Sequence, residues 1–204
     1  VALLRARGPV RRLVLMGSGE PTHNLRAVAA ALHVLRDEGE LGYRHVILST
    51  VGPAAAIDRV AALGVPVTLA LSLHAPTLAL RAELVPTQRD ADPAALLDAA
   101  DRYAAVTRRP YQVEYVLLAG VNDGATEAAA LAGLLEGRRA HVSAIRWNAV
   151  AGMPFGTPTA EAAASFVATL RAAGISATLR RTVGGEATAA CGQLRAARVA
   201  ATAS

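Results

Sequence analysis

Residues 45–73 read HVILSTVGPAAAIDRVAALGVPVTLALSL, and this stretch decides the fold. The apolar run at 45–50 predicts a buried strand. Pro53 opens a helix that carries Ile57, Val60 and Leu63, and Gly64 ends it. Another apolar strand follows at 65–73. A strand, a helix and a strand in this order form the repeating unit of a parallel sheet.

The same alternation continues on both sides of this stretch. Strands are predicted at 13–16, 45–50, 66–73, 112–118 and 141–147, with a short last strand at 176–181. Helices are predicted on the apolar stripe from Leu25 to Leu35, after the Asp92–Pro93 N-cap, after residues 122–124, and from Thr159 to a stop at Gly174. Short apolar strands buried on both faces fit parallel pairing. A barrel and a doubly wound sheet both satisfy this pattern.

Composition limits the classes of protein that the chain can belong to. It has 204 residues, 53% hydrophobic and 18% charged, which is typical of one globular domain. It shows no secretion signal and no apolar run of membrane-spanning length, so we expect no membrane partner. A single cysteine cannot form an internal disulfide, and we expect a cytoplasmic protein.

The basic residues also carry information. The net charge is +5, and all 21 basic residues are arginines. Without lysine, a Schiff base or a phosphate-loop lysine is impossible. The arginine fork suits phosphate groups, which makes a nucleic-acid partner plausible, although arginines on solvated helix faces are common.

Polar residues follow the predicted strands. They are GSGEP at 17–21, Ser49–Thr50, Ser72–Leu73–His74, Glu114 with GVND at 120–123, and Asn148. Because ligands bind at the carboxyl ends of parallel strands, these groups predict one pocket. GSGEP itself fits either a simple strand-to-helix turn with a solvated Glu20 or a turn that offers this carboxylate to a cation such as an amino group.

Several of these motifs occur in an order that resembles one family. They are GSGEP with Asn24–Leu25, STVG at 49–52, SLHAP at 72–76, EYVLLAGVND at 114–123, WN at 147–148 and ACGQL at 190–194. The order is similar to that of the RlmN/Cfr family of radical S-adenosylmethionine enzymes, which methylate adenine in RNA. The resemblance covers nearly the whole chain.

The resemblance implies a parallel partial (β/α)6 barrel of the TIM type, an α/β fold in which the strands lie in sequence order. We expect residues 1–204 to form one such barrel portion, with the first βα unit absent and a C-terminal extension from about residue 175. Gly19 and Glu20 match the turn that grips the amino group of S-adenosylmethionine. Ser49, Ser72, Leu73, His74 and Asn148 match other cofactor-contacting positions.

The resemblance also suggests a role for Cys191. Its counterpart accepts a methyl group from one S-adenosylmethionine and loses a hydrogen atom to a radical made from a second. The resulting carbon radical adds to the adenine ring, and a second cysteine then releases the product. The implied partners are ribosomal or transfer RNA and an electron donor protein such as flavodoxin. Without the resemblance, Cys191 fits an inert, buried small residue.

The sequence departs from the family where the iron–sulfur cluster is bound. The family holds a 4Fe–4S cluster with a CxxxCxxC motif ahead of the GEP strand, and one cysteine cannot replace it, so we expect no metal ligands in this chain. We expect either the C-terminal piece of a longer enzyme or, alternatively, a non-catalytic or divergent homologue that binds S-adenosylmethionine or RNA without radical chemistry. Ser18, Ser143 and Arg146 also differ from the family pattern, which leaves the substrate open.

Overall fold

A computed structural model of the chain describes residues 6, 8–16, 19–149 and 152–180. These residues contain one sheet of six parallel strands in the order β1-β2-β3-β4-β5-β6. The strands are β1 (Leu13–Leu15), β2 (Val46–Thr50), β3 (Thr68–Ser72), β4 (Tyr111–Leu117), β5 (Ala140–Arg146) and β6 (Ala177–Leu179). A doubly wound sheet reverses its strand order, so this sequential order rules that alternative out and fits a barrel.

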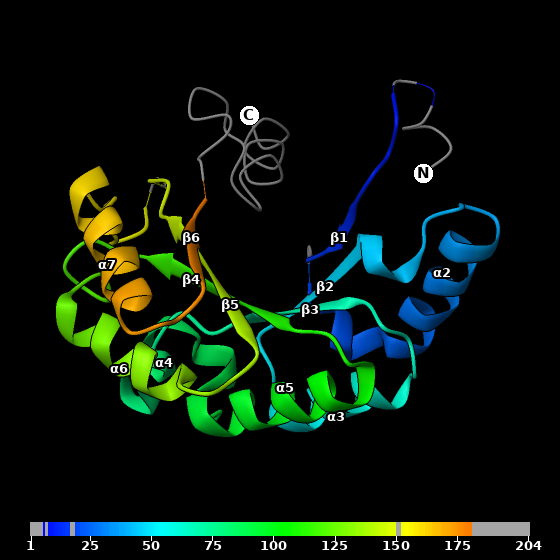
Figure 1. Cartoon of the computed structure of the whole chain (residues 1–204), viewed down its shortest axis with the longest axis horizontal. Helices are drawn as coiled ribbons and strands as arrows, with labels where there is room; N and C mark the ends of the chain where they lie inside the picture. Colours follow the sequence, from blue (N-terminus) through cyan, green and yellow to red (C-terminus); the bar gives the residue numbers. More distant parts are fainter. Residues whose placement is uncertain (1–5, 7, 17–18, 150–151, 181–204) are drawn as a thin grey trace.

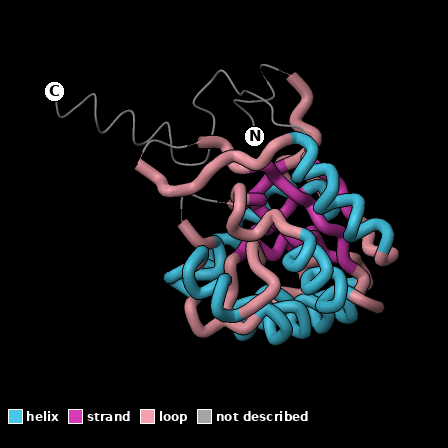
Figure 2. Tube along the Cα trace, turned by 90° about the vertical axis from the view of Figure 1, so that its left-hand side faces the viewer, coloured by secondary structure: helices cyan, strands magenta, loops and turns pink. Residues whose placement is uncertain are grey.

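The sheet is strongly curved, and its helices cover the convex face (Figure 1). The helices are α2 (Leu25–Asp37), α3 (Ala54–Ala62), α4 (Leu78–Leu84), α5 (Pro93–Thr107), α6 (Ala125–Leu135) and α7 (Ala160–Ala172). Seen from the side, strands and helices form two layers (Figure 2). Strands β1 and β6 are not paired with each other, so the described part of the sheet is an open arc.

The core lies between the strands and the helices. Every second strand residue faces the helices, and Leu48, Leu71, Val113 and Val142 on this face are fully buried. Burying each leucine side chain contributes about 1.5–3 kcal/mol. The Tyr115 ring packs on Phe166 of α7 with 5.1 Å between the ring centroids. These contacts join the middle of the sheet to a helix that follows fifty residues later in the chain.

Most of the predicted elements are confirmed. Asp92 caps α5 by accepting a hydrogen bond from the N–H of Ala95 at 3.1 Å, and Thr159 caps α7 in the same way. Gly174 ends that helix with a left-handed φ of 78°. The predicted strand at 66–73 is shorter in the structure, where Pro66 and Val67 precede β3.

Two details differ from the prediction. Pro53 is the N-cap of α3 and not its first residue, because its ψ of 176° is extended. Helix α4 was not predicted: it is only seven residues long, and Thr77 caps it by accepting from the N–H of Leu80. The short β6, Ala177–Leu179, belongs to the sheet, so the expected C-terminal extension from about residue 175 begins with a sheet strand.

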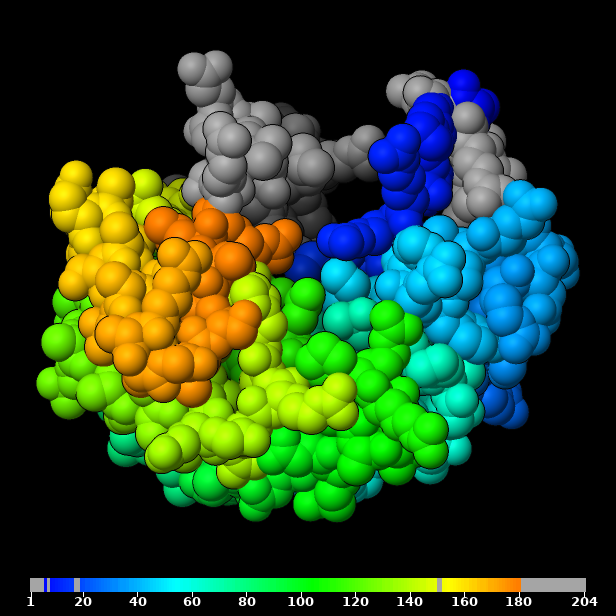
Figure 3. Space-filling model, viewed as in Figure 1, coloured from blue at the N-terminus to red at the C-terminus, as the bar shows by residue number. Residues whose placement is uncertain are grey.

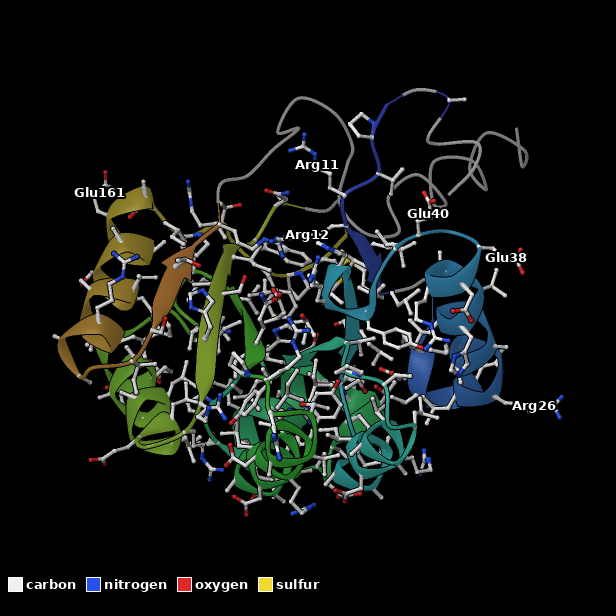
Figure 4. All side chains as sticks on the ribbon, turned by 45° about the vertical axis from the view of Figure 1, so that its right-hand side comes forward. Arg11, Arg12, Arg26, Glu38, Glu40 and Glu161 are labelled. Atoms are coloured by element: carbon white, nitrogen blue, oxygen red, sulfur yellow. The ribbon has the colours of Figure 1, made fainter. Side chains whose placement is uncertain are left out.

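Charged side chains on the outer surface point to solvent. Figure 4 shows Arg26 on α2 and Glu161 on α7 directed away from the sheet, and both are exposed. In the part of the chain that the structure describes, no helix combines the length and the apolar character needed to cross a membrane.

Candidate functional site

A row of polar side chains crosses the concave face of the sheet. Ser72 of β3 pairs in register with Glu114 of β4, which pairs with Ser143 of β5, and Ser143 pairs with Thr178 of β6. On β2, the Ser49 hydroxyl lies 3.2 Å from that of Ser72. The inner face of a closed, packed barrel is filled by apolar side chains, so this row indicates a face that receives a ligand.

A cavity of about 340 Å³ lies at the carboxyl ends of these strands. Its lining includes Met16, Ser49, Ser72, His74, Glu114 and Asn148. The cavity therefore brings together four of the seven predicted cofactor residues: Ser49, Ser72, His74 and Asn148. Leu73 lies between two of them in the sequence, but its side chain is fully buried in the core, and its main-chain N–H donates to the Glu114 carbonyl oxygen at 3.1 Å.

Gly19 and Glu20 line a second, adjoining cavity of about 380 Å³ beside β1 and α2. Met16 borders both cavities and so connects them. Gly19 has a φ of 111°, which favours glycine, and a Cβ placed there would meet no atom of the described residues within 4 Å. The space beside this turn is therefore open to a ligand that approaches the main chain.

His74 is held in a special conformation. Its φ of 63° is left-handed, which is uncommon for a residue other than glycine. Burial lowers the pKa of its imidazole to about 4, and the nearby positive charge of Arg81 adds to the decrease. The ring is therefore neutral at neutral pH and can bind a ligand without adding charge.

Glu114 is the carboxylate at the centre of the concave face, and it is 6% exposed. Burial raises its pKa, while the charge of Arg180 and a hydrogen bond from Ser143 act in the opposite direction. The Arg180 Nη1 atom lies 3.4 Å from the Glu114 carboxylate, and about half of the Arg180 side chain is exposed. The carboxylate also borders the cavity, so it can accept hydrogen bonds from a bound ligand.

No sequence motif singles out Arg81. Its side chain is fully buried, and it donates to the main-chain carbonyls of Val51, Ser72, Gln88 and Ala91 at 2.6–3.4 Å. Burial lowers its pKa to about 10, so it stays charged at neutral pH. Arg81 thus ties the residue after β2 to the end of β3, where Ser72 lines the cavity. Because helix α4 is not predicted from the sequence, this role of Arg81 could not be predicted either.

Trp147 belongs to the WN motif at 147–148. It borders the cavity and is partly exposed, and its ring meets Phe155 edge-on at 6.1 Å between centroids. Its indole nitrogen is buried and has no hydrogen-bond partner among the described residues. Arg146, which departs from the family pattern, donates from Nε and Nη2 to the Pro158 carbonyl oxygen and also borders the cavity.

The predicted catalytic residue Cys191 lies outside the described residues. Within the described ranges, 8–16, 19–149 and 152–180, no group of three or more histidine, cysteine or acidic side chains is arranged to hold a metal ion. Arg12 borders the concave face between β1 and β6 (Figure 4). In the space-filling view, the residues of β1 (blue) and β6 (orange) lie on either side of this face (Figure 3).

The sequence is similar to several RNA methyltransferases. It is 48% identical to a probable dual-specificity RNA methyltransferase RlmN from Rhodopirellula baltica, over 90% of this chain and 50% of that protein. A protein of the same name from Symbiobacterium thermophilum is 47% identical over 91% of this chain and 51% of its own length. A probable RNA methyltransferase from Leptothrix cholodnii is 40% identical over 98% of this chain and 58% of its own length. No family profile matches the chain.

Solved structures agree with these relatives. A radical SAM methyltransferase from Sphaerobacter thermophilus superimposes with a TM-score of 0.88 at 40% identity, over 94% of this chain and 57% of that one. A domain of a pyruvate-formate lyase-activating enzyme from Bacteroides vulgatus shares the fold, with a TM-score of 0.64 at 18% identity, over 82% of this chain and 98% of that domain. The chain spans about half the length of the curated relatives that it matches. It belongs to the RlmN family of radical S-adenosylmethionine methyltransferases.

Proposed function

We propose that this chain forms the S-adenosylmethionine-binding part of an enzyme that methylates an adenine in RNA through Cys191. The substrates would be ribosomal RNA, transfer RNA or both. The observation that carries this proposal is the convergence of Ser49, Ser72, His74 and Asn148, from the ends of three strands, on one cavity. The names of the relatives supply the reaction class.

The cavity and its rim fit a nucleoside that carries an amino-acid group. The volume of about 340 Å³ lies within the range of small-molecule sites. The hydroxyls of Ser49 and Ser72, the carboxylate of Glu114 and the amide of Asn148 offer both donors and acceptors for ribose hydroxyls and ring nitrogens. In the adjoining cavity, Glu20 offers a carboxylate for an amino group.

S-adenosylmethionine, when bound, supplies an activated methyl group and the precursor of a radical. The chain's own residues would orient it and exclude water. The half-buried His74 and the buried Glu114 border the cavity, and the buried guanidinium of Arg81 donates to the carbonyl oxygen of Ser72, which also lines it. The polar groups are fixed before a ligand arrives, which lowers the entropic cost of binding.

A 4Fe–4S cluster does not fit the residues of this chain. Such clusters need three or four thiolates, and the chain has one cysteine. No step is therefore assigned to a cluster held by these residues. In the proposed enzyme, cluster ligands and the reductant, a protein such as flavodoxin, would come from outside this sequence.

The test uses the full-length enzyme and its Cys191→Ala and Cys191→Ser variants. Peptide mass spectrometry should find Cys191 methylated or disulfide-linked in the wild-type protein. Both variants should lose RNA methylation, because neither alanine nor serine can form the thioether. Both substitutions change the side-chain volume little, so the fold should be retained. Unmodified Cys191 together with wild-type activity in the alanine variant would falsify the assignment.

The alternative is a homologue that binds S-adenosylmethionine or RNA without radical chemistry. The single cysteine is the observation that favours it. The two proposals differ in one measurement on the protein as it occurs in the cell. An RNA-modifying enzyme transfers the methyl group of labelled S-adenosylmethionine to RNA under reducing, anaerobic conditions, whereas the alternative protein binds the label and transfers none.

A further inference from the structure

The loop after β4 supports the main chain at His74. The His74 carbonyl oxygen accepts a hydrogen bond from Nδ2 of Asn122 at 2.8 Å. A left-handed conformation at a residue other than glycine costs free energy and persists only where its surroundings enforce it. The bond from Asn122 is such a constraint, and it joins the ends of β3 and β4.

Asn122 is itself fully buried and tightly held. Its Oδ1 atom accepts from the N–H of Leu118 at 2.7 Å, and its Nδ2 atom donates to the Val116 carbonyl oxygen at 2.7 Å as well as to His74. The hydroxyl of Tyr115 donates to the main-chain carbonyl oxygen of Asn122 at 3.1 Å. Both amide hydrogens and the amide oxygen of Asn122 therefore have partners, and only one orientation of the side chain makes all three hydrogen bonds.

The imidazole of His74 is fixed by a second contact. The main-chain N–H of Val116 donates to its Nδ1 atom at 3.2 Å. A main-chain N–H can only donate, so Nδ1 carries no proton. A neutral imidazole then has its proton on Nε2. No partner for Nε2 occurs among the described residues, and the ring borders the cavity that also contains Ser49 and Ser72.

We propose that Asn122, together with the main-chain N–H of Val116, is a positioning residue that presents His74 to the cavity as an Nε2–H hydrogen-bond donor. The ligand atom that faces His74 is then an acceptor, such as a carboxylate oxygen, a hydroxyl oxygen or a purine ring nitrogen. The identity of the ligand as S-adenosylmethionine rests on the proposed function. The tautomer of His74 does not, because it is a property of the protein without ligand.

The first test is the tautomer. In the protein labelled with ¹⁵N-histidine, long-range proton–nitrogen spectra distinguish the two neutral tautomers and the charged ring. The His74→Gln variant identifies the His74 signal among the five histidines. We expect the Nε2–H tautomer alone at neutral pH, without ligand. The Nδ1–H tautomer, a mixture of the two or a charged ring would overturn the proposal.

The second test changes the support. Asn122→Ser removes the donors to His74 and Val116, and Tyr115→Phe removes only the hydroxyl that holds Asn122. Tyr103→Phe is the matched control, since its buried hydroxyl donates to the Val67 carbonyl oxygen at 2.7 Å, away from His74. We expect mixed tautomers and about tenfold weaker S-adenosylmethionine binding in Asn122→Ser, a smaller effect in Tyr115→Phe, and no change of either readout in Tyr103→Phe.

The outcomes separate the two proposals. If the wild-type protein has the Nε2–H tautomer but does not bind S-adenosylmethionine, the proposed ligand is refuted and the positioning role of Asn122 stands. A folded Asn122→Ser protein with an unchanged His74 spectrum and unchanged affinity refutes the positioning role. If Asn122→Ser fails to fold, Tyr115→Phe decides: a His74 spectrum and an affinity identical to those of Tyr103→Phe count against the proposal.

Discussion

The N–H of Val51 donates a hydrogen bond to Oε2 of Glu20 at 3.0 Å, across 31 positions of the chain. The other carboxylate oxygen, Oε1, accepts from the N–H and the hydroxyl of Thr22 at 3.0 and 2.9 Å. Glu20 therefore holds the turn after β1 against the end of β2. Because a carboxylate oxygen has two lone pairs, Oε1 uses both on Thr22, whereas Oε2 keeps one for a cationic group of a ligand.

Replacing Glu20 tests this dual role. Glu20→Ala removes the tether and the charge, and Glu20→Gln keeps the shape but places an amide nitrogen against a main-chain or hydroxyl donor. Both variants should weaken S-adenosylmethionine binding in the full-length protein by roughly 1.5–3 kcal/mol, the value of a hydrogen bond to a charged group. Thr22→Ser, which keeps the hydroxyl bond, is the control. Calorimetry that finds equal affinities for all four proteins would count against the role of Glu20.

The low pKa of His74 makes the stability of the fold depend on pH. The imidazole has a pKa of about 4 in the folded protein and about 6.5 when unfolded. Between these values the unfolded chain binds a proton that the folded chain does not, so the free energy of unfolding falls as the pH decreases through this window. The loss from this group is at most about 3 kcal/mol.

The His74→Gln variant isolates this effect. Its amide oxygen can still accept from the N–H of Val116, but it does not titrate. Urea unfolding across the window should show a flatter pH dependence for the variant than for the wild type. All other titratable groups are the same in the two proteins, so their contributions cancel in the difference. Parallel pH curves for the two proteins would mean that His74 accepts a proton in the folded state as readily as in the unfolded state.

Arg81 should matter more for stability than any arginine on the outer helices. Arg81→Met removes a buried guanidinium that donates to four main-chain carbonyls, and leaves those carbonyls without this donor. We expect a loss of about 2–4 kcal/mol in the free energy of unfolding. The pKa of His74 should also rise, because a nearby positive charge is gone.

Arg102→Met is the matched control for this change. Arg102 pairs with Asp58 through Nε and Nη2, each at 2.9 Å, but its side chain is more than half exposed. Exposed ion pairs contribute little, so this variant should unfold at nearly the wild-type urea concentration. Equal shifts for Arg81→Met and Arg102→Met would show that the buried guanidinium adds nothing beyond an ordinary surface pair.

The sequence predicted the strands well because their signals are local. The apolar runs and the caps at Asp92 and Thr159 are sufficient to place strands and helices, and alternation alone implies parallel pairing. The polar residues at the strand ends could be named for the same reason, since every parallel strand ends at the same edge of the sheet.

What the sequence could not supply depends on contacts between distant residues. Arg81 belongs to the short helix α4, which no sequence pattern predicts, and its four acceptors lie between 7 and 30 positions away. Asn122 belongs to the polar segment that follows a predicted strand, but its hydrogen bond to His74 spans 48 positions of the chain. Leu73 is predicted with its neighbours as a cofactor-contacting residue, and its side chain is fully buried in the core, so a contact with the cofactor would involve its main chain.

A polypeptide of these 204 residues should not form an iron–sulfur cluster by itself. Only Cys191 can provide a thiolate, and a 4Fe–4S cluster needs at least three. Anaerobic reconstitution with iron and sulfide, followed by gel filtration, should leave no stoichiometric iron and no visible charge-transfer absorption on the protein. The same treatment of full-length protein with a CxxxCxxC segment is the positive control. S-adenosylmethionine should bind to the cluster-free chain without being cleaved when dithionite is added. A stable cluster on the 204 residues, or formation of 5′-deoxyadenosine, would show that ligands other than cysteine thiolates serve the iron, and the division of labour proposed for the enzyme would then be wrong.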